Sequence, residues 1–116
     1  MDTLSKTQIM RIYLSSTDKF KNAPLFETLV FLAKRNHMAG ATVIKGVMGF
    51  GASSAVTSTR FWSVSEKLPM IIEIIDTEEK ISNFFRIIKP YLEKVKKGIT
   101  VSVEQVQVLM YKSGVK

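Results

Sequence analysis

The chain has 116 residues, enough for one domain with a substantial core and no second one. Hydrophobic residues make up 46% and charged residues 23%, with a formal net charge of +7 at pH 7. The absence of cysteine excludes disulfides and thiolate metal sites, and the apolar runs are far shorter than the roughly 18 residues of a membrane span. The N-terminal residues lack the apolar segment of a secretory signal, so we expect a cytoplasmic protein.

The first part of the chain predicts a strand, a helix and a second strand. Residues 8–14 form the expected first strand, and a polar connection over 15–22 follows. Pro24 suits the first turn of a helix whose apolar residues recur at the 3.6-residue period through about Met38. Gly40 is the expected stop of this helix, and the β-branched residues of 41–48 predict the second strand.

The stretch that follows is where we expect function to lie. It separates the second strand from apolar residues at 61–64 and a strand at 69–75, and it is longer than the about two to five residues of an ordinary hairpin loop. Gly49 and Gly51 can adopt positive φ and let a ligand approach the backbone. Small and hydroxyl residues then continue to Arg60, and so long a loop is more often functional than a spacer.

The last part of the chain predicts a helix followed by a strand. Asp76 or Thr77 is the expected N-cap, with acidic residues in the first turn and an apolar helical face behind them. Pro90 should kink or end this helix. The final strand begins at Ile99 and continues to Tyr111.

The order β-α-β-loop-β-α-β indicates an α+β fold of the ferredoxin-like type, with a four-stranded antiparallel sheet and both helices on one face. The isoleucines of residues 71–75 cannot all point to that face, because side chains alternate along a strand. The second face of the sheet is therefore expected to be buried as well. Since the chain offers no third helix, other copies of the chain in a trimer are the most economical cover.

An ordered series of motifs resembles one known family. The motifs include Arg11-Ile12-Tyr13-Leu14, Pro24-Leu25-Phe26-Glu27, Ala39-Gly40-Ala41-Thr42-Val43, Gly49-Phe50-Gly51-Ala52-Ser53-Ser54, Ser65-Glu66-Lys67-Leu68-Pro69 and Ile72-Glu73-Ile74-Ile75-Asp76. They are similar to the PII signalling superfamily, and closer to its sister, the PII-like family catalogued as domain of unknown function 190. The resemblance covers residues 8–112 of a single domain expected over 1–116.

The resemblance implies a homotrimer that binds adenine nucleotides in clefts between subunits and signals to a target protein through its long loop. By position, the nucleotide site comprises Gly49, Phe50, Gly51, Ser53, Lys97 and Gly98. The loop that contacts the partner comprises Ser54, Ala55, Val56, Thr57, Ser58, Thr59 and Arg60. A lysine beside glycine amides suits phosphate oxygens. The partner is not indicated by any residue, and a membrane transporter is conceivable from the family.

The chain also departs from the PII pattern. Val108 and Met110 stand near the places where PII proteins carry a basic pair that holds the phosphates, and the loop has no tyrosine for modification. Triphosphate recognition with magnesium is therefore disfavoured, and AMP or ADP is the expected ligand, with no required cofactor.

Two other classes of function, an enzyme and a nucleic-acid-binding domain, have less support in the sequence. His37 is the only histidine and is expected at a helix end or in a loop, and no metal-ligand spacing appears, so an enzyme is not expected. RNA-recognition domains share this order of elements but stack bases on aromatic residues of the two central strands. Here Tyr13 is the one aromatic residue on those strands, so no nucleic-acid partner is expected. An RNA-binding domain and a sensor of a non-nucleotide small molecule are the alternatives.

Overall fold

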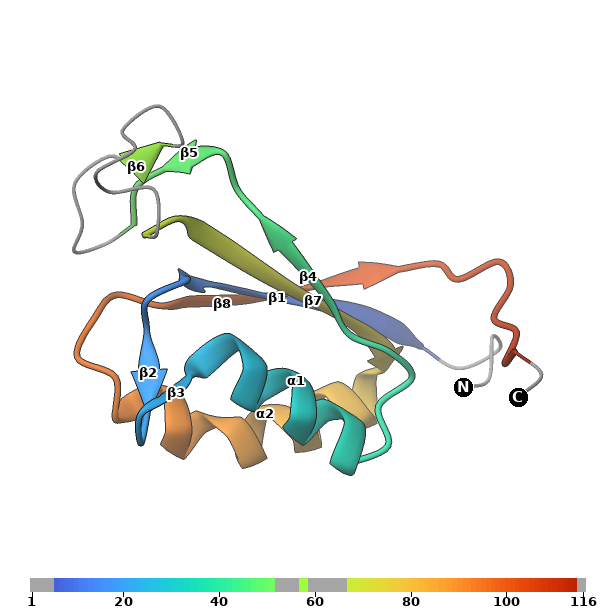
Figure 1. Ribbon diagram of the computed structural model, residues 1–116. Coiled ribbons are helices and arrows are strands. Elements are labelled where there is room, and N and C mark those ends of the chain that lie inside the picture. Colours follow the sequence, from blue (N-terminus) through green and yellow to red (C-terminus); the bar gives the residue numbers. More distant parts are fainter. Residues whose placement is uncertain (1–5, 52–56, 59–66, 115–116) are drawn as a thin grey trace.

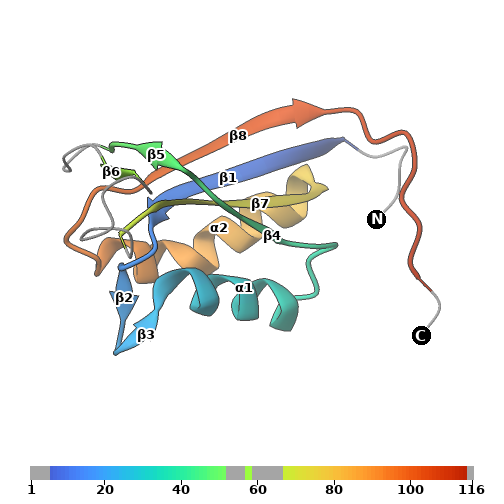
Figure 2. The same ribbon diagram turned by 45° about the horizontal axis from the view of Figure 1, so that its top comes forward.

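Two nine-residue strands, β1 (Thr7–Ser15) and β7 (Pro69–Thr77), form the centre of a four-stranded antiparallel sheet (Figure 1). The computed structural model describes residues 6–51, 57–58 and 67–114. The sheet has the order β4-β7-β1-β8, with β4 at Thr42–Lys45 and β8 at Thr100–Val106. Helices α1 (Leu25–Arg35) and α2 (Glu78–Glu93) cover one face of it (Figure 2). The predicted α+β, ferredoxin-like fold is confirmed.

Four strands of two residues each complete the described secondary structure as two small hairpins. One pairs β2 (Lys19–Phe20), within the predicted polar connection, with β3 (Ala23–Pro24), which directly follows that connection. Lys21 and Asn22 turn this hairpin with φ values of 50° and 68°. The other pairs β5 (Met48–Gly49) with β6 (Thr57–Ser58). The predicted second strand over 41–48 is thus divided into β4 and β5, and residues 61–64 lie outside the described part.

The core lies between the sheet and the two helices. Alternate side chains of β1 and β7 enter it, and Ile12, Ile72 and Ile74 are fully buried. The large members of the cluster that the helices contribute are Leu25, Leu29, Leu32, Ile81, Phe84 and Ile88. Each such side chain stabilises the fold by roughly 1.5–3 kcal/mol when it is fully buried. The 3.6-residue periodicity of the sequence therefore identified the correct helical faces.

The opposite face of the sheet is not covered by any described element, and we call it the open face. Tyr13, Ile44 and Ile75 lie on it and are 40%, 40% and 38% exposed. Their neighbours along the strands point into the core, so the isoleucines of 71–75 divide between two faces as expected. The open face is therefore apolar at several positions although this chain leaves it exposed.

Arg11 occupies the middle of the open face and is bonded to the strands on both sides. Its Nε donates to Glu73 Oε2 at 3.0 Å, and its Nη1 donates to Glu104 Oε1 at 2.8 Å. These hydrogen bonds, first to Glu104 and then to Glu73, raise the pKa of Arg11. Arg11 thereby joins Glu73, directly opposite it on β7, to Glu104, which lies diagonally across on β8.

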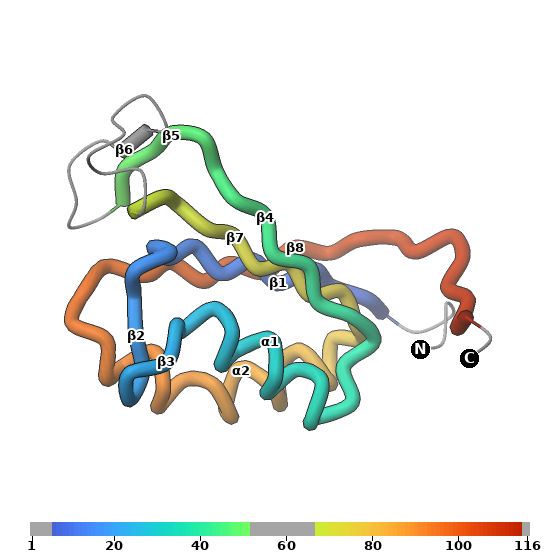
Figure 3. Tube along the Cα trace, viewed as in Figure 1, coloured from blue at the N-terminus to red at the C-terminus, as the bar shows by residue number. Residues whose placement is uncertain are grey.

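The two helices end differently from the sequence prediction. Helix α1 ends at Arg35, and His37, with φ of 59°, reverses the chain instead of Gly40. Its amide donates to Lys34 O, and the next amide, of Met38, donates to Ala33 O. Figure 3 shows the chain turning there and rising to β4. Pro90 does not end α2, which continues to Glu93, because the apolar side chains that follow Pro90 still pack on the core.

The start of α2 agrees with the sequence prediction, and the end of β8 differs from it. Thr77 is the N-cap of α2, since its Oγ1 accepts a hydrogen bond from the Lys80 amide at 3.2 Å. Strand β8 ends at Val106, earlier than the predicted Tyr111. The Tyr111 hydroxyl instead donates to Ala39 O at 3.4 Å, so the segment after β8 reaches the connection between α1 and β4.

Asp76 is a buried carboxylate, 1% exposed, at the junction of β7 and α2. Its Oδ1 accepts from the Thr77 amide at 2.7 Å and its Oδ2 from the Ala39 amide at 2.8 Å. The ammonium of Lys80 lies 3.8 Å from Oδ2 and donates to His37 O. Asp76 therefore fixes the chain after α1 to the beginning of α2.

We expect Asp76→Ala to lower the free energy of unfolding by about 3 kcal/mol, because two buried amides lose their acceptor. Urea denaturation followed by circular dichroism measures this difference. The control is Ser82→Ala, an exposed position of the same helix, where the change should stay within about 0.5 kcal/mol. Equal stability of the two variants would show that Asp76 does not anchor this junction.

Candidate functional site

A pocket of about 290 Å³ lies at the end of the sheet where β1 ends and both β7 and β8 begin. The pairing of strands brings these ends together, since Ser15 is opposite Pro69 and Tyr13 is opposite Thr100. All four residues line the pocket. Residues just after β4, around β5 and between α2 and β8 complete its wall. The pocket is thus assembled from segments that are far apart in the sequence.

The pocket collects most of the residues predicted to bind a nucleotide. Its lining includes Gly49, Phe50, Gly51, Lys97 and Gly98. The sixth predicted residue, Ser53, lies outside the described part of the chain. Of the predicted partner loop, Thr57 and Ser58 form β6, whereas residues 54–56, 59 and 60 also lie outside it.

The glycines of this region do not have the backbone conformation that the sequence allowed for them. None of the glycines in the described residues has a positive φ, so the expectation for Gly49 and Gly51 is wrong. The constraint is instead steric and falls mainly on Gly46, whose amide donates to Pro69 O at 2.7 Å. A Cβ on Gly46 would lie 2.7 Å from Pro69 Cγ, whereas one on Gly49 would lie 3.4 Å from the same atom. The absence of a side chain at Gly46 lets the backbone pass closely over Pro69, whereas the distance at Gly49 is that of an ordinary contact.

Lys67 lines the same pocket and was missed by the sequence reasoning. Its position depends on the next residue, Leu68, which is buried and doubly bonded to the turn after β1. The Ser16 amide donates to Leu68 O at 2.8 Å, and the Leu68 amide donates to Ser16 Oγ at 2.9 Å. The one available signal was the motif over 65–69, which gave no reason to place a lysine in a site.

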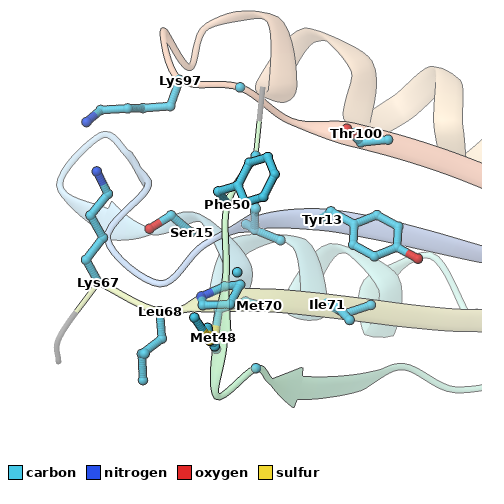
Figure 4. Close-up of a pocket in the computed structure, with 16 residues that line it drawn as sticks. Tyr13, Ser15, Met48, Phe50, Lys67, Leu68, Met70, Ile71, Lys97 and Thr100 are labelled. Atoms are coloured by element: carbon cyan, nitrogen blue, oxygen red, sulfur yellow. The ribbon is translucent and has the colours of Figure 1, made fainter. Parts of the chain in front are cut away.

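Figure 4 shows that the two ends of the pocket differ in chemistry. Lys67 and Lys97 lie at one end, and Tyr13, Ile71 and Thr100 lie toward the other. Phe50 projects between them and is 76% exposed. No described residue of the lining is acidic. The arrangement suits a ligand that carries a negative charge at one end and a flat or apolar group at the other.

Over residues 6–51, 57–58 and 67–114, no group of three or more His, Cys, Asp or Glu side chains could hold a metal ion. His37 lies in the turn after α1 and does not line the pocket. Neither described helix is long and apolar enough to cross a membrane.

Comparison with known sequences establishes the family. The model of the DUF190 family, described as Uncharacterized ACR, COG1993, matches residues 7–108. The chain belongs to this family. A UPF0166 protein of Aquifex aeolicus is 33% identical to this DUF190 chain over 84 residues, which are 72% of this chain and 80% of the relative. A UPF0166 protein of Methanocaldococcus jannaschii is 38% identical over 77 residues, covering 66% of this chain and 70% of the relative.

Solved structures show that the DUF190 chain has a PII-like fold. CPII, a nitrogen regulatory PII-like protein from Thiomonas intermedia bound to ADP, AMP and bicarbonate, gives a TM-score of 0.62 at 16% identity. The match covers 89% of this chain and 90% of CPII. A putative PII-like signaling protein from Thermus thermophilus gives 0.61 at 21% identity, covering 90% of each chain. At these identities the likeness concerns the fold, and it confirms the predicted PII-like architecture.

We expect Gly46→Ala to destabilise the DUF190 chain by roughly 1–3 kcal/mol, because the added methyl group would overlap Pro69. Urea denaturation gives the magnitude, and nuclear magnetic resonance shifts of residues 67–70 locate the disturbance. Gly40→Ala is the matched control, since a Cβ there meets nothing within 4 Å. A Gly46→Ala protein as stable as the control would contradict the close approach.

Proposed function

We propose that this DUF190 protein is a non-enzymatic sensor that binds an adenine nucleotide, AMP or ADP, in the pocket at the end of the sheet. The observation that carries the proposal is the composition of the pocket, in which lysines and glycine backbone adjoin apolar and aromatic surface. Lysine ammonium groups and backbone amides suit phosphate oxygens, and Phe50 or Tyr13 offers a surface on which a base can pack. The binding of ADP and AMP by CPII, which shares the fold, supports this choice.

The proposed sensor is a cytoplasmic homotrimer whose subunits pack through the open face. Tyr13, Ile44 and Ile75 give this face large apolar side chains that are more than a third exposed, and a second copy of the chain would cover them. The hydrogen bonds of Arg11 to both neighbouring carboxylates offset part of the desolvation cost of burying these charges in such an interface. Subunits meeting on this face would bring the sheet-end pockets toward the boundaries between chains.

The proposed sensor signals through the loop over residues 54–60, which contacts a target protein. Within it, β6 pairs Thr57 with Gly49, so the backbone of the loop is bonded to a residue of the pocket. A ligand that binds loop conformations unequally shifts their populations, and the partner then meets a different surface. A membrane transporter is one conceivable target. RNA is less well supported, since Tyr13 is the one aromatic side chain on the two central strands.

Calorimetric titration with AMP, ADP, ATP and cyclic AMP, with and without magnesium, tests the ligand. We expect one nucleotide per chain, with AMP or ADP bound more tightly than ATP with magnesium, since Val108 and Met110 provide no cation for further phosphates. Light scattering of the same sample should give the mass of a trimer. A trimer that binds none of these nucleotides would overturn the choice of ligand and favour a different small molecule.

We expect Ile75→Asp to convert the trimer into monomers, because a carboxylate on the open face would lose its hydration in the interface. Light scattering measures the mass, and circular dichroism verifies that the variant is folded. The matched control is Phe31→Asp, which alters a side chain that is 64% exposed on α1, away from the open face. The control should remain a trimer, and an unchanged mass for Ile75→Asp would place the interface elsewhere.

A further inference from the structure

Two lysines from distant parts of the sequence share one end of the pocket. Lys67 precedes β7, and Lys97 lies in the connection between α2 and β8. Figure 4 shows both side chains at the same end, away from Tyr13 and Ile71. The described ion pairs of the chain involve Arg11 and Lys80, and neither pocket lysine has an acidic partner in the described ranges.

We infer that Lys67 and Lys97 together form the anion-binding end of the pocket and read the phosphates of a nucleotide that lies along it. The inference rests on the proposed function and adds to it a second cation and a direction for the ligand. The phosphates lie between the two ammonium groups, and the base lies toward Tyr13 and Ile71.

The end of the pocket at Lys67 and Lys97 carries two positive charges and no counter-charge among the described lining residues. Like charges that share a concave end repel each other, and an anion placed between them relieves this repulsion. A lysine ammonium is a compact charge with three donors on a flexible stem, so it can follow a phosphate group of variable position. No described lining residue is acidic, so nothing described in the wall repels the anion.

The backbone holds the two lysines in different ways. The neighbour of Lys67, Leu68, is fixed by its two hydrogen bonds to Ser16, and Pro69 is fixed by the Gly46 amide. Lys97 follows the C-terminal end of α2, where the Val95 amide donates to Leu92 O at 3.2 Å. An anion bound to both lysines therefore joins the start of β7 to the connection before β8. Nucleoside diphosphates fit this end best, because each phosphate adds negative charge between the lysines.

The test is calorimetric titration of the full chain and of Lys67→Gln and Lys97→Gln with ADP, AMP, adenosine and inorganic pyrophosphate. Each substitution should weaken ADP binding about tenfold, because one charge-assisted hydrogen bond is lost. Adenosine binding should change by less than about twofold, since adenosine carries no phosphate. Lys67→Arg keeps the charge and should restore most of the ADP affinity, whereas a purely structural role of Lys67 would give no such selectivity.

Two control variants carry the same loss of charge elsewhere. Lys45→Gln and Lys96→Gln alter exposed lysines that do not line the pocket, and they should change ADP affinity by less than about twofold. If Lys67→Gln binds ADP as these controls do, the inference is overturned while the proposed function stands. If the chain binds pyrophosphate through both lysines but no nucleotide, the lysine site stands and the proposed function fails. Binding of none of the four probes overturns both.

Discussion

The pairing of β1 with β7 sets the positions of both the core and the candidate site. It runs over nine residues of each strand and decides which side chains face the helices. A slip of one residue would turn Ile12 out of the core and bring Arg11 into it. The same register sets Ser15 opposite Pro69, and through them the strand ends that line the pocket. Core and candidate site are therefore two results of a single alignment of strands.

The sequence predicted the elements well because each of them buries one face, which leaves a readable period in the apolar residues. It was less reliable at the helix ends, where contacts from elsewhere decide. The sequence predicts Gly40 as the stop of α1, yet the chain reverses at His37, and the Asp76 carboxylate accepts a hydrogen bond from the Ala39 amide. No residue near Gly40 in the sequence indicates that Ala39 will bond to Asp76 on β7.

The candidate site was predictable to the extent that a motif marked it. Gly49 and Gly51 stood out in the sequence, although neither has the positive φ that glycine permits, and the steric need for glycine beside Pro69 falls on Gly46. Lys67 could not be recognised in the same way. Its place in the pocket follows from hydrogen bonds between Leu68 and Ser16, and such a pairing of distant segments has no local sequence pattern.

Tyr13 joins the two parts of the proposed function. It lies on the open face, beside Ile71 on the neighbouring strand, and it also lines the pocket. Under the proposed assembly, the contact between subunits and the contact with a ligand would meet at this side chain. A ligand that binds the trimer more tightly than the free chain must favour the trimer by the same free energy, because the two equilibria are linked. Trimer assembly and ligand binding would then be coupled at the end of the sheet. The long loop begins after Gly51, which lines the same pocket as Tyr13, so it would start next to the residues that both events involve.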